Sequence, residues 1–225
     1  MNREIDFSTV LASSVHDMKN SLALVLQQLE NVAEETQDLT VGPKVAQLYY
    51  EAQRINSNLV HLLHLYRYQQ QNSSLNVDCH YVDEIVEELV MNNQLYLEQK
   101  AITLEVNISE DCYVYCDRDL IINLLNDIVI NAMRYTADKL VITAVHRDDG
   151  QVTVEIADNG PGYPEQMLAA VTTALIEPNE SSRTGLGIYF AQQIAAAHQR
   201  AGKKGFIELE NGGHLGGSVF KLTLP

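Results

Sequence analysis

Tryptophan is absent from the 225-residue chain, proline and cysteine are scarce, and only 15 basic residues stand against 30 acidic ones. The formal net charge of −15 argues against nucleic acid or an anionic membrane as a partner. No apolar run has the length of a membrane span, and the start Met1-Asn2-Arg3-Glu4 does not resemble a signal peptide. We therefore expect a cytoplasmic protein without membrane insertion.

The three cysteines indicate neither a metal site nor a disulfide framework. Their number is odd, and Cys79, Cys112 and Cys116 lack the partners of a metal site. Reduced thiols are expected, with Cys112 and Cys116 as ordinary side chains of a strand.

The length and the apolar content of 46% fit two small domains. A polar run from Gln69 to Asn76 ends the periodic pattern of the first part, and we interpret it as a linker. We predict a first domain over residues 1–72 and a second over residues 77–225.

The first domain is predicted to be an antiparallel helical hairpin. Residues 5–34 contain no glycine or proline and carry apolar residues in alternating steps of four and three: Leu11, Val15, Met18, Leu22, Val25, Leu29 and Val32. After the turn signal Gly42-Pro43, the spacing continues with Val45, Leu48, Ala52, Ile55, Leu59, Leu62 and Tyr66. Because a lone hairpin buries little apolar area, we expect a homodimer in which two hairpins form a four-helix bundle.

His16 lies just outside this seam, beside Asp17 and four residues before Asn20. A neutral imidazole is a nucleophile toward phosphorus, and an adjacent carboxylate can orient it and accept its second proton. Asn20 could position a water that removes the phosphate. For any single histidine, an ordinary surface position is the stronger interpretation, and only the motifs further along the chain favour a phosphate acceptor.

The second domain has an α+β pattern, which predicts a sheet with helices on one face. Helices are expected at Tyr81–Gln99, Arg118–Tyr135 and Thr184–His198, and strands at Ile102–Ile108, Cys112–Cys116, Lys139–His146, Gln151–Ala157, Phe206–Leu209 and Ser218–Leu224. The turn Asp148-Asp149-Gly150 joins two of these strands as a hairpin.

The helix at 118–135 carries Asp127, Asn131 and Arg134 on one face, away from its apolar stripe. An acid, an amide and a cation in this order suit a magnesium–triphosphate group, since Mg²⁺ takes hard oxygen ligands and keeps several waters. A plain solvated helix face is an alternative of similar weight.

Two glycine motifs follow. Asp158 ends an alternating strand and begins the first motif, Asp158-Asn159-Gly160-Pro161-Gly162. Its glycines permit positive φ and close approach of a ligand. The Asp158 carboxylate could accept a hydrogen bond from an adenine amino group. Thr184-Gly185-Leu186-Gly187 opens a helix whose N-terminal amides attract phosphate. Taken alone, the first motif is better explained as a plain β-turn, and the second motif is weak evidence for a phosphate site. The order and spacing of all three elements carry the specificity.

Over nearly its whole length the chain resembles the bacterial sensor histidine kinases of two-component systems. The matching segments are Ser14–Leu22 for the H box, Asp127–Thr136 for the N box, Asp158–Gly162 for the G1 box, Arg183–Gly187 for the G2 box and Gly216–Pro225 for the terminal strand. The resemblance implies a helical dimerisation and phosphotransfer domain followed by an ATP-binding α/β sandwich of the histidine kinase type.

The resemblance also implies a role for each matched residue. His16 would be phosphorylated from ATP, Asp17 would assist, and Asn20 would serve a phosphatase reaction. Asn131 would ligate Mg²⁺, Asp158 would read adenine, and Arg134 and Tyr135 would line the nucleotide. The phosphoryl group would pass to an aspartate on the receiver domain of a response regulator.

Three positions depart from the family pattern. Ser21 replaces the usual proline, so no kink need follow His16. Asp127 replaces the first asparagine of the N box, and we hypothesise some ATP hydrolysis without phosphotransfer. Only 21 residues separate Gly162 from Thr184, so we expect a short ATP lid with a helix at Glu165 to Leu175.

The chain offers no room for a sensor domain, so input is expected from the bundle itself or from a separate sensory protein. Two other functions stay open. A phosphorelay adaptor with a vestigial nucleotide fold is favoured by the short lid and opposed by Asn131, Asp158 and both glycine motifs. An ATPase that works as a conformational clamp is supported by Asp127 alone.

Overall fold

The computed structural model describes residues 7–35, 75–173 and 185–225, together with residues 44–45, 47–49, 51–53, 55–56 and 59. The chain divides into two compact units, Met1–Ser74 and Leu75–Pro225.

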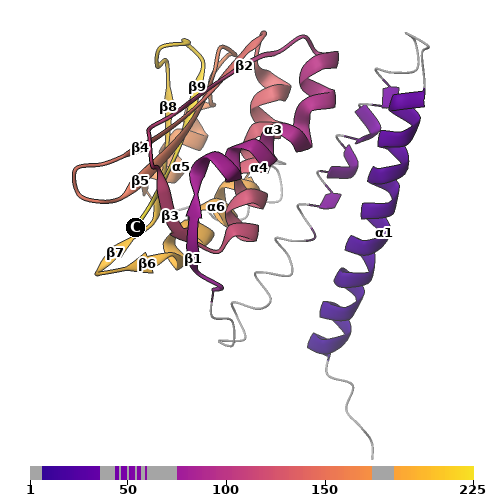
Figure 1. The fold of residues 1–225 in the computed structure, drawn as a ribbon, viewed down its shortest axis with the longest axis horizontal. Helices are drawn as coiled ribbons and strands as arrows, with labels where there is room; N and C mark the ends of the chain where they lie inside the picture. The colour runs from indigo at the N-terminus through magenta and orange to yellow at the C-terminus, as the bar shows by residue number, and fades with distance from the viewer. Residues whose placement is uncertain are drawn as a thin grey trace, which may run out of the picture. The chain divides into compact units, whose positions relative to one another are not determined.

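The N-terminal unit is helical where it is described, as expected. Helix α1 runs from Phe7 to Glu35 without a break, and the described residues between 44 and 59 are helical too (Figure 1). The Ser21 hydroxyl donates to the Asp17 carbonyl at 3.0 Å. A proline at this position would clash with that same carbonyl, so the departure at Ser21 is compatible with a straight passage beyond His16.

Much of the predicted heptad seam is exposed in a single copy of the chain. Val15, Val45 and Ala52 are buried. Several other seam positions are largely exposed: Met18 at 54%, Val25 at 46%, Val32 at 43%, Leu48 at 58% and Ile55 at 49%. The N-terminal unit of a single copy therefore leaves these apolar side chains exposed.

The C-terminal unit is an α+β domain built on a five-stranded mixed sheet, which confirms the predicted fold class. Its elements are β1 (Asp78–Tyr81), α3 (Val82–Gln99), β2 (Thr103–Ile108), β3 (Tyr113–Cys116), α4 (Arg118–Tyr135), β4 (Lys139–His146), β5 (Val152–Asp158), α5 (Glu165–Thr173), α6 (Gly185–Ala197), β6 (Gln199–Arg200), β7 (Lys203–Lys204), β8 (Phe206–Asn211) and β9 (Ser218–Leu224). The sheet order is β2-β4-β5-β9-β8. Only β2 and β4 pair in parallel, and the other neighbours are antiparallel.

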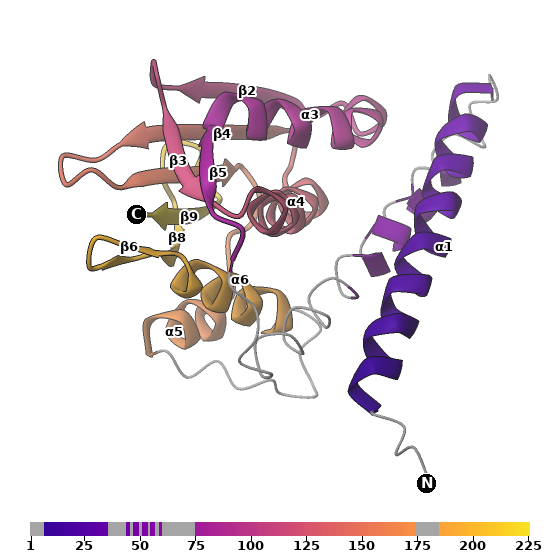
Figure 2. The ribbon, with the colours of Figure 1, turned by 60° about the horizontal axis from the view of Figure 1, so that its bottom comes forward.

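Helices α3, α4 and α6 pack over one face of this sheet (Figure 2). Buried apolar side chains of β5 and β9 alternate with Thr153, Glu155 and Lys221, so that Ile156 and Phe220 are buried opposite each other. Leu125 of α4 is fully buried in the same core. Asp158 shares the inward face of Ile156, two residues further along β5, and so lies under the helices.

Three short features differ from the predictions. Tyr81 ends strand β1, which pairs with β3, and helix α3 starts one residue later. On α3, Val86 is buried, and Val90, which we expected on the apolar face of this helix, is only half-buried. The β6–β7 hairpin was not predicted. Four-residue and two-residue strands are too short for a periodic pattern. Strand β1 is defined by its distant partner β3, and β6 and β7 are defined by their pairing with each other.

All three cysteines are free, with Cys112 and Cys116 buried and Cys79 exposed. Burial raises the pKa of the Cys116 thiol to about 12, and the charge of Asp117 adds to the increase. The Cys116 thiol therefore stays protonated and unreactive at neutral pH, as expected for an ordinary strand residue.

His198 ties the end of α6 to the start of α4. Its side chain is 1% exposed, and Nε2 accepts the Asp117 N–H at 3.0 Å. Nδ1 must therefore carry the proton of the neutral ring, and it donates to the Ile194 carbonyl at 2.7 Å. Asp117 in turn caps α4 by accepting the Leu120 N–H, and its other carboxylate oxygen accepts the Asn76 N–H at 3.0 Å.

This geometry predicts a pH-dependent stability. Burial lowers the pKa of His198, although its bond to the Ile194 carbonyl and the Asp117 charge oppose the shift. In the unfolded chain, His198 binds a proton with a pKa of about 6.5, whereas in the folded chain its pKa is lower. Stability is fully present above that pH and falls as the pH drops below it.

We expect His198→Gln to remove this component. Urea unfolding of wild type and variant between pH 8 and pH 5.5 should show a constant difference in unfolding free energy above about pH 7. The difference should shrink below about pH 6.5, because only the wild type must keep this imidazole neutral. A difference that stays constant over the whole range would contradict the assignment.

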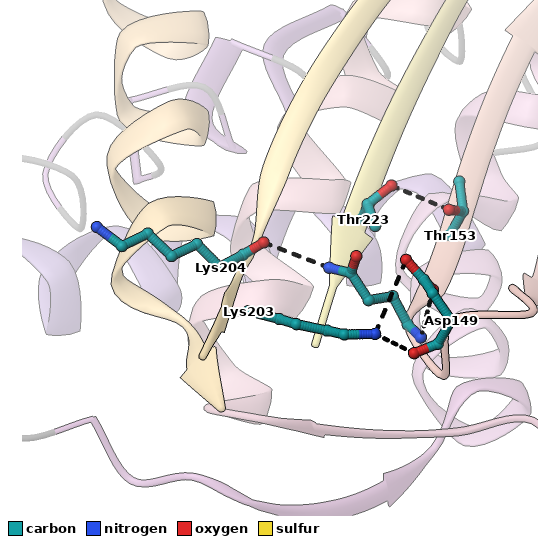
Figure 3. A network of polar contacts seen from close by, with 6 residues as sticks. Asp149, Thr153, Lys203, Lys204 and Thr223 are labelled. Atoms are coloured by element: carbon teal, nitrogen blue, oxygen red, sulfur yellow. Dashed lines mark hydrogen bonds and ion pairs between the residues drawn. The ribbon is translucent and has the colours of Figure 1, made fainter. Parts of the chain in front are cut away.

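The end of the sheet furthest from Asp158 is held by a polar network (Figure 3). The Lys203 ammonium donates to the Asp149 carbonyl and lies 3.9 Å from its carboxylate. Gln151 Nε2 donates to the Lys204 carbonyl at 3.3 Å, so the β6–β7 hairpin is attached to the β4–β5 turn. The hydroxyls of Thr153 and Thr223 lie 2.9 Å apart across the adjoining strands.

Candidate nucleotide-binding site

The C-terminal half of α4 presents the predicted polar residues outside its buried stripe. Asn131 and Arg134 are exposed, and Asp127 is half-buried one turn before Asn131. Tyr135 is 48% exposed, and the Arg134 guanidinium lies 5.4 Å from the centroid of its ring. An amide oxygen, a cation and an aromatic face are thus gathered at one end of this helix.

Asp158 ends β5 and is only 2% exposed. Its Oδ1 accepts the N–H of Gly160 at 2.7 Å and that of Ser218 at 3.2 Å, and its Oδ2 accepts the Ser218 hydroxyl. Ser218 is the first residue of β9, so pairing of β5 with β9 places this partner. Three donors to one carboxylate fix its orientation.

Gly160 and Gly217 are required by packing around Asp158. A Cβ on Gly160 would lie 2.4 Å from the Tyr135 carbonyl oxygen, and one on Gly217 would lie 2.3 Å from the Asp158 carbonyl oxygen. We expected the glycines of the G1 motif to leave room for a ligand. For Gly160, the structure shows instead that the missing side chain lets the loop contact the end of α4.

Asn159 joins the same loop to the segment after α4. Its Oδ1 accepts the Thr136 hydroxyl at 2.7 Å and the N–H groups of Ala137, Asp138 and Lys139 at 3.1 Å each. The G1 loop and the end of the N-box helix are therefore held together as one rigid corner.

Asn211 was missed by sequence reasoning because it lies at the end of β8, outside every motif. Its Oδ1 accepts the Tyr163 N–H at 2.7 Å, and its Nδ2 donates to the Tyr163 carbonyl at 2.8 Å. Gly162 next to it has φ +83°, where a side chain is strained and would also meet Asn211. The positive φ predicted for the G1 motif is thus present at Gly162.

Tyr163 was also missed. Burial raises the pKa of its phenol to about 12; hydrogen bonding with Ser218 opposes the shift, and the Asp158 charge adds to it. No sequence pattern signals its place in the site, because its bonding partner Asn211 lies 48 positions further along the chain.

The remaining predicted residues lie on two other helices. Gly185 begins α6, which also contains Leu186 and Gly187, while Thr184 lies outside the described residues. A Cβ on Gly187 would meet nothing within 4 Å. Helix α6 packs against α4. His16, Asp17 and Asn20 are all residues of α1, and the Asp17 and Asn20 side chains are exposed.

Among the described residues, no group of three or more His, Cys, Asp and Glu side chains could hold a metal ion. A Mg²⁺ ion that arrives with a nucleotide needs only one or two protein oxygens. The exposed Asn131 amide and the Asp127 carboxylate one turn earlier fit that requirement. None of the helices formed by the described residues has the length and apolar character needed to span a membrane.

Residues 116–225 match the model of the family described as histidine kinase-, DNA gyrase B-, and HSP90-like ATPase. This part of the chain is therefore a domain of that ATPase family. Most of the chain also resembles proteins named as sensor or sensory kinases.

Two curated relatives show this resemblance to sensory kinases. It is 24% identical to the sensor histidine kinase GraS of Staphylococcus haemolyticus, over 82% of the chain and 53% of that protein. It is 25% identical to the adaptive-response sensory kinase SasA of Rippkaea orientalis, over 96% of the chain and 57% of that protein. The chain thus spans about half the length of these curated relatives.

Solved histidine kinases confirm the fold. The Acinetobacter baumannii kinase AdeS superposes with a TM-score of 0.60 at 22% identity, over 91% of this chain and 95% of that one. Full-length ShkA in complex with AMPPNP superposes with a TM-score of 0.64 at 20% identity, over 96% of this chain and 45% of that one.

Proposed function

We propose that the protein is an ATP-dependent protein-histidine kinase that phosphorylates His16 and passes the phosphoryl group to an aspartate of a response regulator. The observation that supports this most is the fixed Asp158 carboxylate beside the G1 glycines, in an ATPase-family domain that shares its chain with the His16 helix. The named kinases GraS and SasA are similar over most of the chain.

Each residue of the candidate site has its own part in binding the nucleotide. Asp158 accepts a hydrogen bond from the adenine amino group, Arg134 and Tyr135 line the nucleotide, and the α6 N-terminus with Gly185 and Gly187 faces its phosphates. Asn131, with Asp127 near it, would hold Mg²⁺, and the ion would neutralise phosphate charge. These roles follow from the hydrogen-bonding and charge properties of each side chain.

Once the nucleotide is bound, the transfer step itself is carried out by His16 and Asp17 of α1. A nitrogen of the neutral His16 imidazole attacks the γ-phosphorus, the N–P bond forms, and the bond from phosphorus to the leaving ADP oxygen breaks. Asp17 accepts the imidazole proton. In the reverse function, Asn20 orients a water that removes the phosphoryl group from the regulator, which makes the protein a phosphatase as well.

We propose that the protein acts as a homodimer. Met18, Val25 and Val32 on α1 and Leu48 and Ile55 on the following helical segment are largely exposed in one copy. Two copies that pair these residues in a four-helix bundle would bury them. Input then reaches the bundle itself or comes from a separate sensory protein.

Two alternatives differ from this proposal in measurable ways. Asp127 on α4 supports an ATPase clamp, in which the carboxylate activates water instead of serving transfer to histidine. A phosphorelay adaptor would receive phosphate on His16 without using ATP.

The kinase proposal predicts a specific label on the protein. The purified chain incubated with γ-labelled ATP and Mg²⁺ should acquire phosphate that is labile in acid and stable in base, as expected of a phosphohistidine. Addition of a receiver domain should move the label to that domain. Release of phosphate without protein label would favour the clamp, and absence of both label and ATP binding in calorimetry would favour the adaptor.

A further inference from the structure

The short connection between α4 and β4 is bound by one side chain from a distant part of the chain. Helix α4 ends at Tyr135 and β4 begins at Lys139, so residues 136–138 form this connection. Three successive N–H groups, from Ala137 to Lys139, donate to the Oδ1 of Asn159 at 3.1 Å each. Successive amides that converge on one acceptor form a nest, and the acceptor fixes the backbone around it.

The orientation of the Asn159 amide is set from both of its ends. The oxygen also lies 2.7 Å from the Thr136 hydroxyl, which donates to it. The Nδ2 donates to the Asp138 Oδ1 at 2.7 Å. A reversed amide would place its NH₂ group against N–H donors and its oxygen against a carboxylate. Both ends of this side chain are therefore matched to the α4–β4 connection.

Asn159 lies between two parts of the candidate site. The residue before it is Asp158, whose carboxylate is proposed to bind adenine. The residue that precedes its partner Thr136 is Tyr135, which is proposed to line the nucleotide from the end of α4. The side chain of Asn159 thus joins the backbone that carries Asp158 to the backbone that follows Tyr135.

Strand pairing alone does not make this junction. The β4–β5 ladder begins with Leu140 opposite Asp158, after the connection has ended. Strand β2 reaches the connection at the Asp138 carbonyl, which accepts the Thr103 N–H at 2.8 Å. The N–H groups of the connection are bound from the G1 loop, by the Asn159 oxygen.

We propose that Asn159 is a positioning residue for nucleotide binding, which holds Tyr135 at the place where it and Asp158 contact the same nucleotide. This inference rests on the proposed function. Asn159 itself does not contact the nucleotide. Two contacts with one ligand both contribute fully only when the protein holds them in a matching arrangement before the ligand binds. Without the Asn159 oxygen, the N–H groups of the connection turn to water and Tyr135 loses that arrangement.

The test is a double-mutant cycle on ATP affinity, measured by calorimetry on the full chain. Tyr135→Ala should weaken ATP binding by about tenfold, as expected for the loss of an aromatic contact with a nucleotide. Asn159→Ala should also weaken it by about tenfold. In the Asn159→Ala background, Tyr135→Ala should cost no more than about threefold, because Tyr135 has already lost its position.

A conservative exchange separates positioning from general damage. Asn159→Asp keeps the acceptor oxygen but sets a carboxylate against Asp138, and adding Asp138→Asn supplies the lost donor from the other side. This double variant should bind ATP within about twofold of the wild type and recover the tenfold cost of Tyr135→Ala. Asn159→Asp alone should bind ATP more weakly than the double variant. Urea unfolding of each variant shows that it is folded under the conditions of the binding measurement.

Asn107→Ala is the matched control, because it removes an exposed asparagine from β2. It should leave the ATP affinity and the tenfold cost of Tyr135→Ala unchanged. The inference is overturned if Tyr135→Ala costs tenfold in both backgrounds, if it costs nothing in the wild type, or if the exchanged pair binds ATP as weakly as Asn159→Ala. Tight ATP binding by the wild type leaves the proposed function standing in these cases. A wild type that binds no ATP overturns both together.

Discussion

His16→Gln is expected to abolish the acid-labile phosphate label, with a loss of at least about a hundredfold relative to the wild type. The glutamine amide is not a nucleophile toward phosphorus, so no other atom at this position can form the N–P bond. The measurement is the label per chain after incubation with γ-labelled ATP, followed by acid and base treatment.

ATP binding should survive this substitution. The proposed nucleotide residues belong to the compact unit Leu75–Pro225, whereas His16 belongs to the unit Met1–Ser74. Calorimetry should give a dissociation constant within about twofold of the wild-type value, which is a free-energy change below about 0.4 kcal/mol. Loss of both label and binding would show that the variant is damaged as a whole.

His146→Gln provides the matched control for the chemistry. His146 is an exposed histidine at the end of β4 that pairs with Val152, at the opposite end of β5 from Asp158. This variant should keep the full label. If His16→Gln were labelled as strongly as His146→Gln, another residue would be the acceptor and the proposed mechanism would be wrong.

Gly217→Ala is expected to have the second large effect, on both stability and ATP affinity. The new Cβ would lie 2.3 Å from the Asp158 carbonyl oxygen, 2.5 Å from its Oδ1 and 2.6 Å from the Gly160 nitrogen. Two of these atoms are backbone, so the strand end itself must move. Overpacking of this kind costs about 1–3 kcal/mol of unfolding free energy.

The displaced groups are those that orient Asp158. The Gly217 N–H donates to the Asp158 carbonyl at 3.1 Å, and the next residue supplies two bonds to the carboxylate. We expect ATP affinity to fall by at least about tenfold, or about 1.4 kcal/mol, because the carboxylate no longer points where the base requires it. Urea unfolding and calorimetry measure the two effects separately.

Gly187→Ala is the control for the unfolding measurement. Its Cβ would meet nothing within 4 Å, and it lies inside α6, where alanine is a better helix former than glycine. Stability should stay equal or rise by up to about 1 kcal/mol. A Gly217→Ala variant as stable as Gly187→Ala and with wild-type ATP affinity would refute the packing argument.

The sequence predicted the long periodic elements well. The bounds of α4 and β4 agree with the expected ranges, because an apolar stripe over 18 residues or alternation over eight leaves little ambiguity. The lid helix was expected from Glu165 and is observed from there to Thr173, with the following residues outside the description. Strand β1 was not predicted, because it depends on pairing with β3 rather than on its own pattern.

The candidate site was predictable in its motif residues but not in its supports. Asp158 stands out because a carboxylate follows an alternating strand and precedes two nearby glycines. Its partner Ser218 and the clamp residue Asn211 come from β9 and β8, some 50 to 60 residues further along the chain. A single sequence carries no signal that joins such distant positions, so tertiary pairing alone reveals them.

The Asp117 carboxylate has a mechanical consequence. One of its oxygens holds the Asn76 N–H at 3.0 Å, and the other holds the first turn of α4. A force on the polypeptide before Leu75 would therefore be transmitted to α4 through the Asp117 carboxylate before it reached the sheet. Asn131 and Tyr135 lie near the other end of α4, so such a force would reach the part of the helix that is proposed to bind the nucleotide.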